Sequence, residues 1–96
     1  MNFDELRSII EINSWTKNKE GVDKNGDIFA SWMSDIGMKL VRHSRDEIGD
    51  HLHFKSTHRD GKKLLLLGHL DTVFPPDTFE EFREDDEWIY GAGVVI

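Results

Sequence analysis

The chain of 96 residues contains no cysteine and only two prolines. Without cysteine it has neither disulfide bonds nor thiolate ligands for a metal ion. It also lacks an apolar run approaching the roughly 20 residues of a membrane-spanning helix. The acidic start at Asp4 and Glu5 is unlike a signal peptide. From these absences we expect a cytoplasmic protein with no membrane partner.

Basic residues are scarce as well. There are 12 Lys and Arg against 19 Asp and Glu, which gives a net charge of −7 at pH 7. An acidic surface repels phosphate groups, so no nucleic-acid partner is expected. Apolar residues, in contrast, make up 38% of the chain and include three Trp and six Phe. This composition favours one small folded domain over a disordered chain.

Apolar residues at helical spacing predict two helices in the first part of the chain. The first follows Asn2, which can serve as its N-cap. Its apolar stripe consists of Phe3, Leu6, Ile9 and Ile10. The second is predicted to begin near Asn18 or Gly21. It should end before Gly37, which suits the left-handed position of a Schellman cap.

Shorter patterns predict strands at residues 39–43 and 51–56. Apolar and polar residues alternate in the second of these, as in a half-buried strand. Asp60-Gly61 is a local hairpin signal that would pair this strand with the apolar run after it. A smaller hairpin, turning at Asp85-Asp86, is predicted to place residues 87–90 in a further strand.

The longest apolar run is Leu64–Leu67, which has no polar face and is predicted to be a strand buried on both faces. His69 and Asp71 follow it directly and, two residues apart in extended chain, should point the same way. Open α/β sheets bind ligands at the carboxyl ends of their strands. Imidazole is a common zinc ligand, and a neighbouring carboxylate commonly orients it. The pair therefore indicates part of a metal site, with a chance His-x-Asp pattern as the alternative.

Two further patterns are weaker candidates for metal sites. His51 and His53 share one face of a predicted strand, but no third ligand is evident near them. The acidic run from Asp77 to Glu87 matches no calcium-loop spacing, and a solvated face explains it better.

The run Leu64–Val73, taken with Gly91–Val95, resembles the start of the catalytic domain of the dinuclear zinc exopeptidases and deacylases. This family includes glutamate carboxypeptidase, acetylornithine deacetylase, succinyl-diaminopimelate desuccinylase and aminoacylase, and the first of these branches is the most similar. The resemblance covers essentially the whole chain. It implies an α/β fold with a partial mixed sheet between layers of helices. Residues 1–96 would then be one truncated catalytic-domain fragment without the lid or dimerisation domain.

The resemblance also implies a zinc-dependent hydrolase that cleaves amide bonds of peptides or N-acyl amino acids. His69 would be a terminal ligand to one of two zinc ions, and Asp71 would orient it. The family's second strand lies at the sheet edge beside the first, and its third runs parallel to the first. That order would override the hairpin signal at Asp60-Gly61.

The sequence departs from the family at its last residue, because Ile96 stands where the metal-bridging Asp is expected. A catalytic zinc normally has three protein ligands, and this chain offers one. We therefore expect at most one weak zinc site and no hydrolysis by residues 1–96 alone. The expected origin is the N-terminal piece of a longer hydrolase. The alternative is a non-enzymatic remnant of the fold that binds partners or self-associates.

Overall fold

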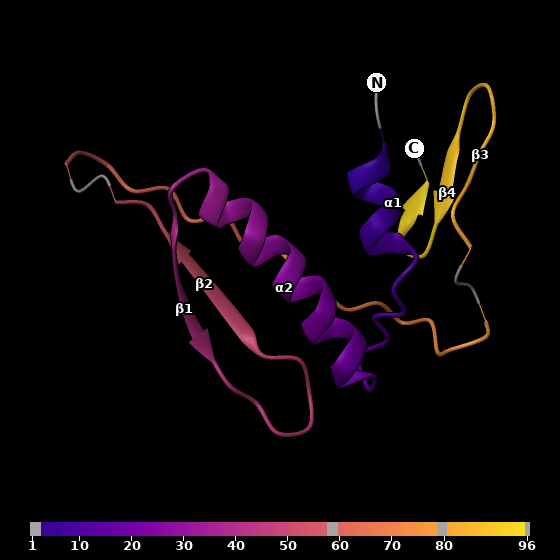
Figure 1. Cartoon of the computed structure of the whole chain (residues 1–96), viewed down its shortest axis with the longest axis horizontal. Helices are drawn as coiled ribbons and strands as arrows, with labels where there is room; N and C mark the ends of the chain where they lie inside the picture. Colours follow the sequence, from indigo (N-terminus) through magenta and orange to yellow (C-terminus); the bar gives the residue numbers. More distant parts are fainter. Residues whose placement is uncertain (1–2, 58–59, 79–80, 96) are drawn as a thin grey trace.

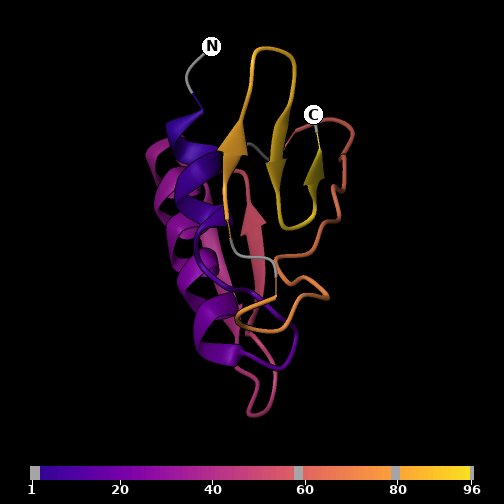
Figure 2. The ribbon, with the colours of Figure 1, turned by 90° about the vertical axis from the view of Figure 1, so that its right-hand side faces the viewer.

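The computed structural model describes residues 3–57, 60–78 and 81–95. Within these residues the elements are α1 (Asp4–Ile10), α2 (Lys19–Asp35), β1 (Lys39–His43), β2 (His51–Lys55), β3 (Arg83–Glu84), β4 (Ile89–Gly91) and β5 (Val94–Val95). In Figure 1 the two helices lie between the β1–β2 ribbon and strands β3–β5. After a turn of 90° the helices form one side of the molecule and the strands the other (Figure 2). The predicted α/β class is confirmed, with the described strands in two small antiparallel sheets, β1-β2 and β3-β4-β5.

Both predicted helices are present, and their N-termini differ in how they are capped. Phe3 occupies the N-cap position of α1 and makes no side-chain capping bond, while the expected cap, Asn2, lies outside the described residues. Asn18 caps α2, since its side-chain oxygen accepts a hydrogen bond from the backbone N–H of Gly21. This bond satisfies one of the free donors of the first helical turn.

The C-terminus of α2 is the predicted Schellman cap. Gly37 has a φ of 84°, in the left-handed region that glycine adopts without strain. Its N–H donates to the carbonyl of Ser34 at 2.9 Å, and the N–H of Met38 donates to the carbonyl of Met33 at 3.0 Å. These two bonds define the motif and turn the chain from α2 into β1.

The β1–β2 ribbon packs against α2 through one face. Leu52 and Phe54 are half-buried, and the other three residues of β2 are exposed, which confirms the predicted alternation. Gly26 in α2 makes the close approach possible, because a Cβ there would lie 3.0 Å from Leu52 Cδ1 and 3.5 Å from Leu70 Cδ1. The helix-propensity cost of this glycine is thus offset by packing.

An ionic cluster around Asp50 fixes the loop between β1 and β2 to α2. The Asp50 carboxylate lies 2.8 Å from Lys19 Nζ and 3.1 Å from Arg42 Nε, and it accepts the backbone N–H of Arg45 at 2.8 Å. The backbone N–H of Asp50 in turn donates to the carboxylate of Asp23. The hydrogen bond from Lys19 is the main cause that lowers the pKa of Asp50 below its ordinary value.

The β3-β4-β5 sheet packs against α1. Its small core contains Ile10, Phe82 and Ile89, with Phe3 and Leu6 packed against them. A Cβ at Gly91 would collide with the side chain of Ile10, so only glycine allows β4 to lie this close to α1.

The predicted hairpin at Asp85-Asp86 is confirmed. The N–H of Asp85 donates to the carbonyl of Trp88 at 2.9 Å, and the Asp85 carboxylate accepts the N–H groups of Glu87 and Trp88. These backbone donors, that of Glu87 first, lower the pKa of Asp85. At least this carboxylate of the acidic run has a structural role as a turn residue.

The prediction of a buried strand at Leu64–Leu67 is wrong for this structure. The four side chains are 71–88% exposed, and residues 62–71 contain no helix or strand. A strand buried on both faces needs neighbours on each side to take its backbone hydrogen bonds. No described strand pairs with it: β2 pairs only with β1, so the hairpin expected from Asp60-Gly61 does not form either.

Candidate functional site

The chain after the leucine run is held by the loop between α1 and α2. Trp15 and Thr72 form a parallel β-bridge. Within it the N–H of Thr72 donates to the carbonyl of Ser14 at 2.8 Å, and the N–H of Thr16 donates to the carbonyl of Thr72 at 3.0 Å. The segment that carries His69 and Asp71 is therefore fixed at its C-terminal end by residues more than 50 positions earlier.

Asn13 organises this loop from within. Its Nδ2 donates to the carbonyl of Phe74 at 3.1 Å, and its Oδ1 accepts the N–H of Trp15 at 3.2 Å. Its own carbonyl accepts a bond from Asn18 Nδ2 at 3.0 Å. A Cβ at Gly21 would overlap that carbonyl, so a glycine is required where α2 begins. The loop, both of its asparagines and the start of α2 form one hydrogen-bonded unit.

His69, Asp71 and Thr16 form a chain of hydrogen bonds. His69 Nδ1 lies 2.8 Å from the backbone O of Asp71 and 3.2 Å from its Oδ1. Thr16 Oγ1 donates to Asp71 Oδ2 at 2.6 Å. The His69 side chain is 82% exposed and the Asp71 side chain 35% exposed. The structure thus places the two predicted site residues in contact, and it adds Thr16 as the group that holds the carboxylate.

The acceptors around Nδ1 determine the form of the neutral imidazole. A carbonyl and an ionised carboxylate only accept, so Nδ1 must carry the proton and Nε2 must carry the free lone pair. Among the described residues, Nε2 of His69 has no hydrogen-bond partner. The hydrogen bond from Thr16, above all, lowers the pKa of Asp71, which keeps its carboxylate ionised at neutral pH. The arrangement therefore presents one ligating nitrogen to solvent in a fixed tautomer.

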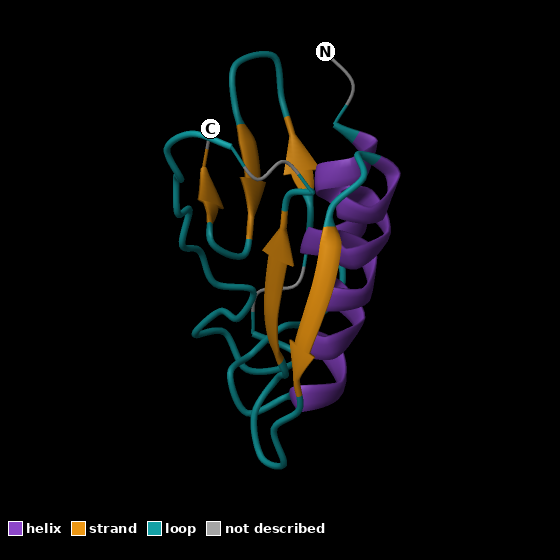
Figure 3. Cartoon of the chain, turned by 90° about the vertical axis from the view of Figure 1, so that its left-hand side faces the viewer, coloured by secondary structure: helices purple, strands orange, loops and turns teal. Residues whose placement is uncertain are grey.

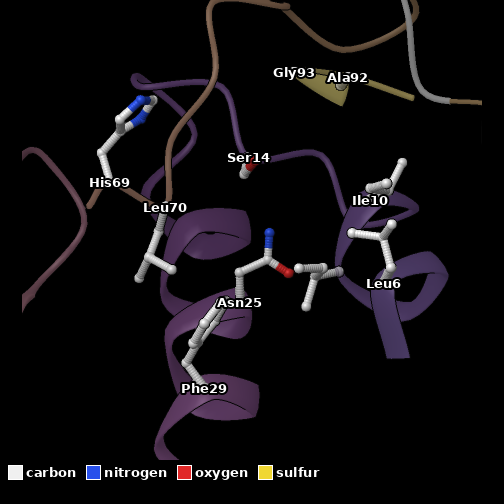
Figure 4. A pocket seen from close by; sticks show the side chains of 10 residues that line it. Leu6, Ile10, Ser14, Asn25, Phe29, His69, Leu70, Ala92 and Gly93 are labelled. Carbon is white, nitrogen blue, oxygen red and sulfur yellow. The ribbon is translucent and has the colours of Figure 1, made fainter. Parts of the chain in front are cut away.

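A cavity of about 260 Å³ opens beside His69. Its walls come from both helices, from the segment at His69 and from the turn between β4 and β5: Leu6, Ile9, Ile10, Ser14, Asn25, Phe29, His69, Leu70, Ala92 and Gly93. Figure 4 shows His69 at its edge and the Asn25 amide directed into it. Asn25 is 4% exposed, and within the described part of the chain its Oδ1 has no hydrogen-bond partner. The cavity is thus mostly apolar, with polar groups from Ser14, Asn25 and His69 in its wall.

These residues do not by themselves make a zinc centre. In residues 3–57, 60–78 and 81–95, no three His, Cys, Asp or Glu side chains are grouped to hold a metal ion. His69 supplies one open nitrogen, whereas a catalytic zinc normally takes three protein ligands. His51 and His53 lie on a different element, β2, on the ribbon at the opposite side of the molecule from β3–β5 (Figure 1).

Sequence reasoning missed Thr16 and Asn13, because loop residues far from His69 in sequence carry no local pattern that marks them. The signal that did exist is chemical, since Asn and Thr are residues whose side chains commonly bond to nearby backbone.

Comparison with known proteins gives one informative similarity. The chain is 28% identical over 93 residues to carboxypeptidase G2 of Pseudomonas sp. (strain RS-16). The match covers 93% of this chain but only 22% of that enzyme, so the chain spans about a fifth of the length of the curated relative. No protein-family model matches the chain. The similarity indicates a carboxypeptidase-like origin. Among the described helices, none is long and apolar enough to cross a membrane.

Proposed function

We propose that residues 1–96 are part of the catalytic domain of a zinc-dependent peptidase or amidohydrolase of the dinuclear zinc exopeptidase family. Its substrate class would be peptides or N-acyl amino acids. The observation that carries the proposal is the hydrogen-bonded series Thr16–Asp71–His69, which leaves Nε2 of His69 open. The partial similarity to a carboxypeptidase supports the same origin.

In this proposal His69 is one ligand of a two-zinc site, and Asp71 and Thr16 are positioning residues. The carboxylate and the hydroxyl act through the imidazole, by fixing its tautomer and ring orientation. The ions would supply Lewis-acid activation of the scissile amide in the complete site. The remaining ligands and the general base would come from outside this chain. Residues 1–96 are accordingly proposed to be inactive alone, in the cytoplasm.

The imidazole of His69 provides the direct test. Long-range proton–nitrogen NMR spectra should show His69 with the proton on Nδ1, and added Zn²⁺ should shift Nε2 first. Asp71→Asn removes the charged acceptor and leaves only the backbone carbonyl of residue 71 to hold the proton on Nδ1. The variant should therefore show a larger fraction of His69 with the proton on Nε2 and a weaker zinc response. His53→Gln is the matched control and should leave the His69 signals unchanged. A His69 that carries its proton on Nε2 in the parent chain would contradict the proposal.

The coding DNA offers a second, independent test. The family continues after Gly-x-Gly with an Asp-Met-Lys-Gly-Gly-like segment whose Asp bridges the metals. We expect one of the three frames downstream of the codon for Ile96 to encode such a segment. If no frame does, this chain does not derive from a complete member of the family.

The leucine run supports a second candidate function, a self-associating module. Leu64–Leu67 present four exposed apolar side chains in a segment that belongs to no helix or strand. Such segments associate with other chains, and a second copy is the occupant we propose. Sedimentation should show concentration-dependent dimers that Leu65→Lys disrupts. A strictly monomeric parent chain would rule this candidate out.

A further inference from the structure

The antiparallel register of the β1–β2 ribbon places two histidines directly opposite one another. His43, the last residue of β1, pairs with His51, the first residue of β2. Directly opposite residues project from the same face of a sheet, with Cβ atoms about 4.5–5.5 Å apart. Both residues are exposed. Because side chains alternate along a strand, they project from the face opposite the one through which Leu52 packs against α2. Figure 3 shows the β1–β2 ribbon with the helices beside it.

Neither imidazole is committed to another contact. In the part of the chain that the structure describes, the side chains of His43 and His51 take part in no hydrogen bond or ion pair. Imidazole nitrogen suits late first-row divalent metal ions, with bonds of about 2.0–2.1 Å to zinc. Two rings at this separation can therefore turn their nitrogens toward one ion between them.

We propose that His43 and His51 form a two-histidine site for a divalent ion such as Ni²⁺, Cu²⁺ or Zn²⁺, with water completing the coordination. The site is distinct from the series at His69 and does not depend on the proposed peptidase function. Since no three ligating side chains are grouped among the described residues, the protein supplies two ligands.

The loop between the two histidines holds them in place before any ion binds. Asp50, adjacent to His51, accepts the backbone N–H of Arg45 at 2.8 Å and so closes the loop across its base. The same carboxylate is paired with Lys19 of α2 and with Arg42, the neighbour of His43. An ordered base lowers the entropy lost when both rings engage one ion.

Along this face of the ribbon, a bound cation is repelled least at the end that carries His43 and His51. The next pair on the same face is Val41 with His53, and the pair after that is Lys39 with Lys55. The lysines lie four residues away, about 13 Å along a strand, which exceeds the screening length of about 8–10 Å at ordinary salt. His53 is diagonal to His43, at about 7–8 Å between backbones, and is a poorer partner than His51.

Titration of the 96-residue chain with Ni²⁺ and with Zn²⁺, followed by NMR of the imidazole signals, tests the site. We expect the signals of His43 and His51 to respond together. His43→Gln and His51→Gln should each weaken binding about tenfold or more, because the second nitrogen then no longer acts at a high effective concentration. The matched control His53→Gln should change affinity less than about threefold, and His69→Gln should leave this site unchanged.

A rescue experiment uses the register itself. In a His43→Gln background, Val41→His creates a new opposite pair with His53, and it should restore binding to within about threefold of the parent. Backbone amide spectra confirm that each variant keeps the β1–β2 pairing. The proposal is overturned if His53→Gln weakens binding as much as His43→Gln, if Val41→His fails to rescue in a folded variant, or if binding depends on His69.

Discussion

The segment before Gly68 is exposed, whereas the segment after it is fixed by hydrogen bonds. Before it, Leu64–Leu67 form the longest apolar run of the chain and are 71–88% exposed. After it, the polar residues Asp71 and Thr72 are fixed by hydrogen bonds to the loop between the helices. The hydrophobicity of a segment sets the free energy that its burial would contribute. The segment is buried, however, only if another part of the protein packs against it. Here the polar segment has one among the described residues, and the leucine run has none.

The largest expected effect on stability comes from Gly21, which packs against the loop that fixes the segment after Gly68. Gly21→Ala should lower the free energy of unfolding by about 3 kcal/mol, because the new Cβ overlaps the carbonyl of Asn13 and the loop must move. Gly68→Ala is the control: a Cβ there has no heavy atom within 4 Å, so stability should change by less than about 0.5 kcal/mol. Chemical denaturation measures both. Equal losses of stability in the two variants would contradict the conclusion that only the segment after Gly68 is fixed by this loop.

Two side-chain truncations to alanine test whether the leucine run is exposed, in comparison with a core residue. Ile10→Ala removes a core side chain that is 6% exposed, and it should cost about 2–3 kcal/mol. Leu66→Ala removes a side chain that is 82% exposed and should change stability by less than about 0.5 kcal/mol. Denaturation of both variants at the same protein concentration gives the comparison. A cost at Leu66 equal to that at Ile10 would show that the run is buried in solution.

A smaller effect concerns the hydrogen bond from Thr16 to Asp71. Because the pKa of Asp71 is lowered in the folded chain, its contribution is present above the ordinary value of 3.8 and is lost as pH falls through the lower folded value. Thr16→Val should raise the Asp71 pKa toward that ordinary value. It should cost about 1 kcal/mol or less at pH 7, given the partial exposure of Asp71. Carboxyl NMR titration and denaturation at pH 7 and pH 3 measure the change. An unaltered Asp71 pKa in the variant would contradict this assignment.

Much of the fold follows from local signals in the sequence. Asn18 and Gly37 mark the ends of α2 because capping is chemistry of one or two residues. The alternation in β2 and the turn at Asp85-Asp86 are equally local, and both are present. The leucine run was predicted wrongly because its burial depends on strands that its own residues do not specify.

The candidate site was predicted only in part. His69 and Asp71 are two residues apart, so their contact could be inferred from extended geometry. Thr16 donates a hydrogen bond to Asp71 from a distant loop, and strand register places His43 opposite His51. Neither arrangement has a sequence signature. The zinc and substrate assignments stay predictions that rest on the resemblance.

Amide hydrogen exchange, resolved by residue with NMR, tests the difference between the two segments most directly. The account predicts that the amides of Thr16 and Thr72 are protected by their bonds to Thr72 and Ser14. At a protein concentration at which the chain is monomeric, it also predicts that the amides of Leu64–Leu67 exchange at the rates of unstructured peptide. Protection of the leucine amides to the level of β1 and β2 would contradict it, since that would require a paired strand.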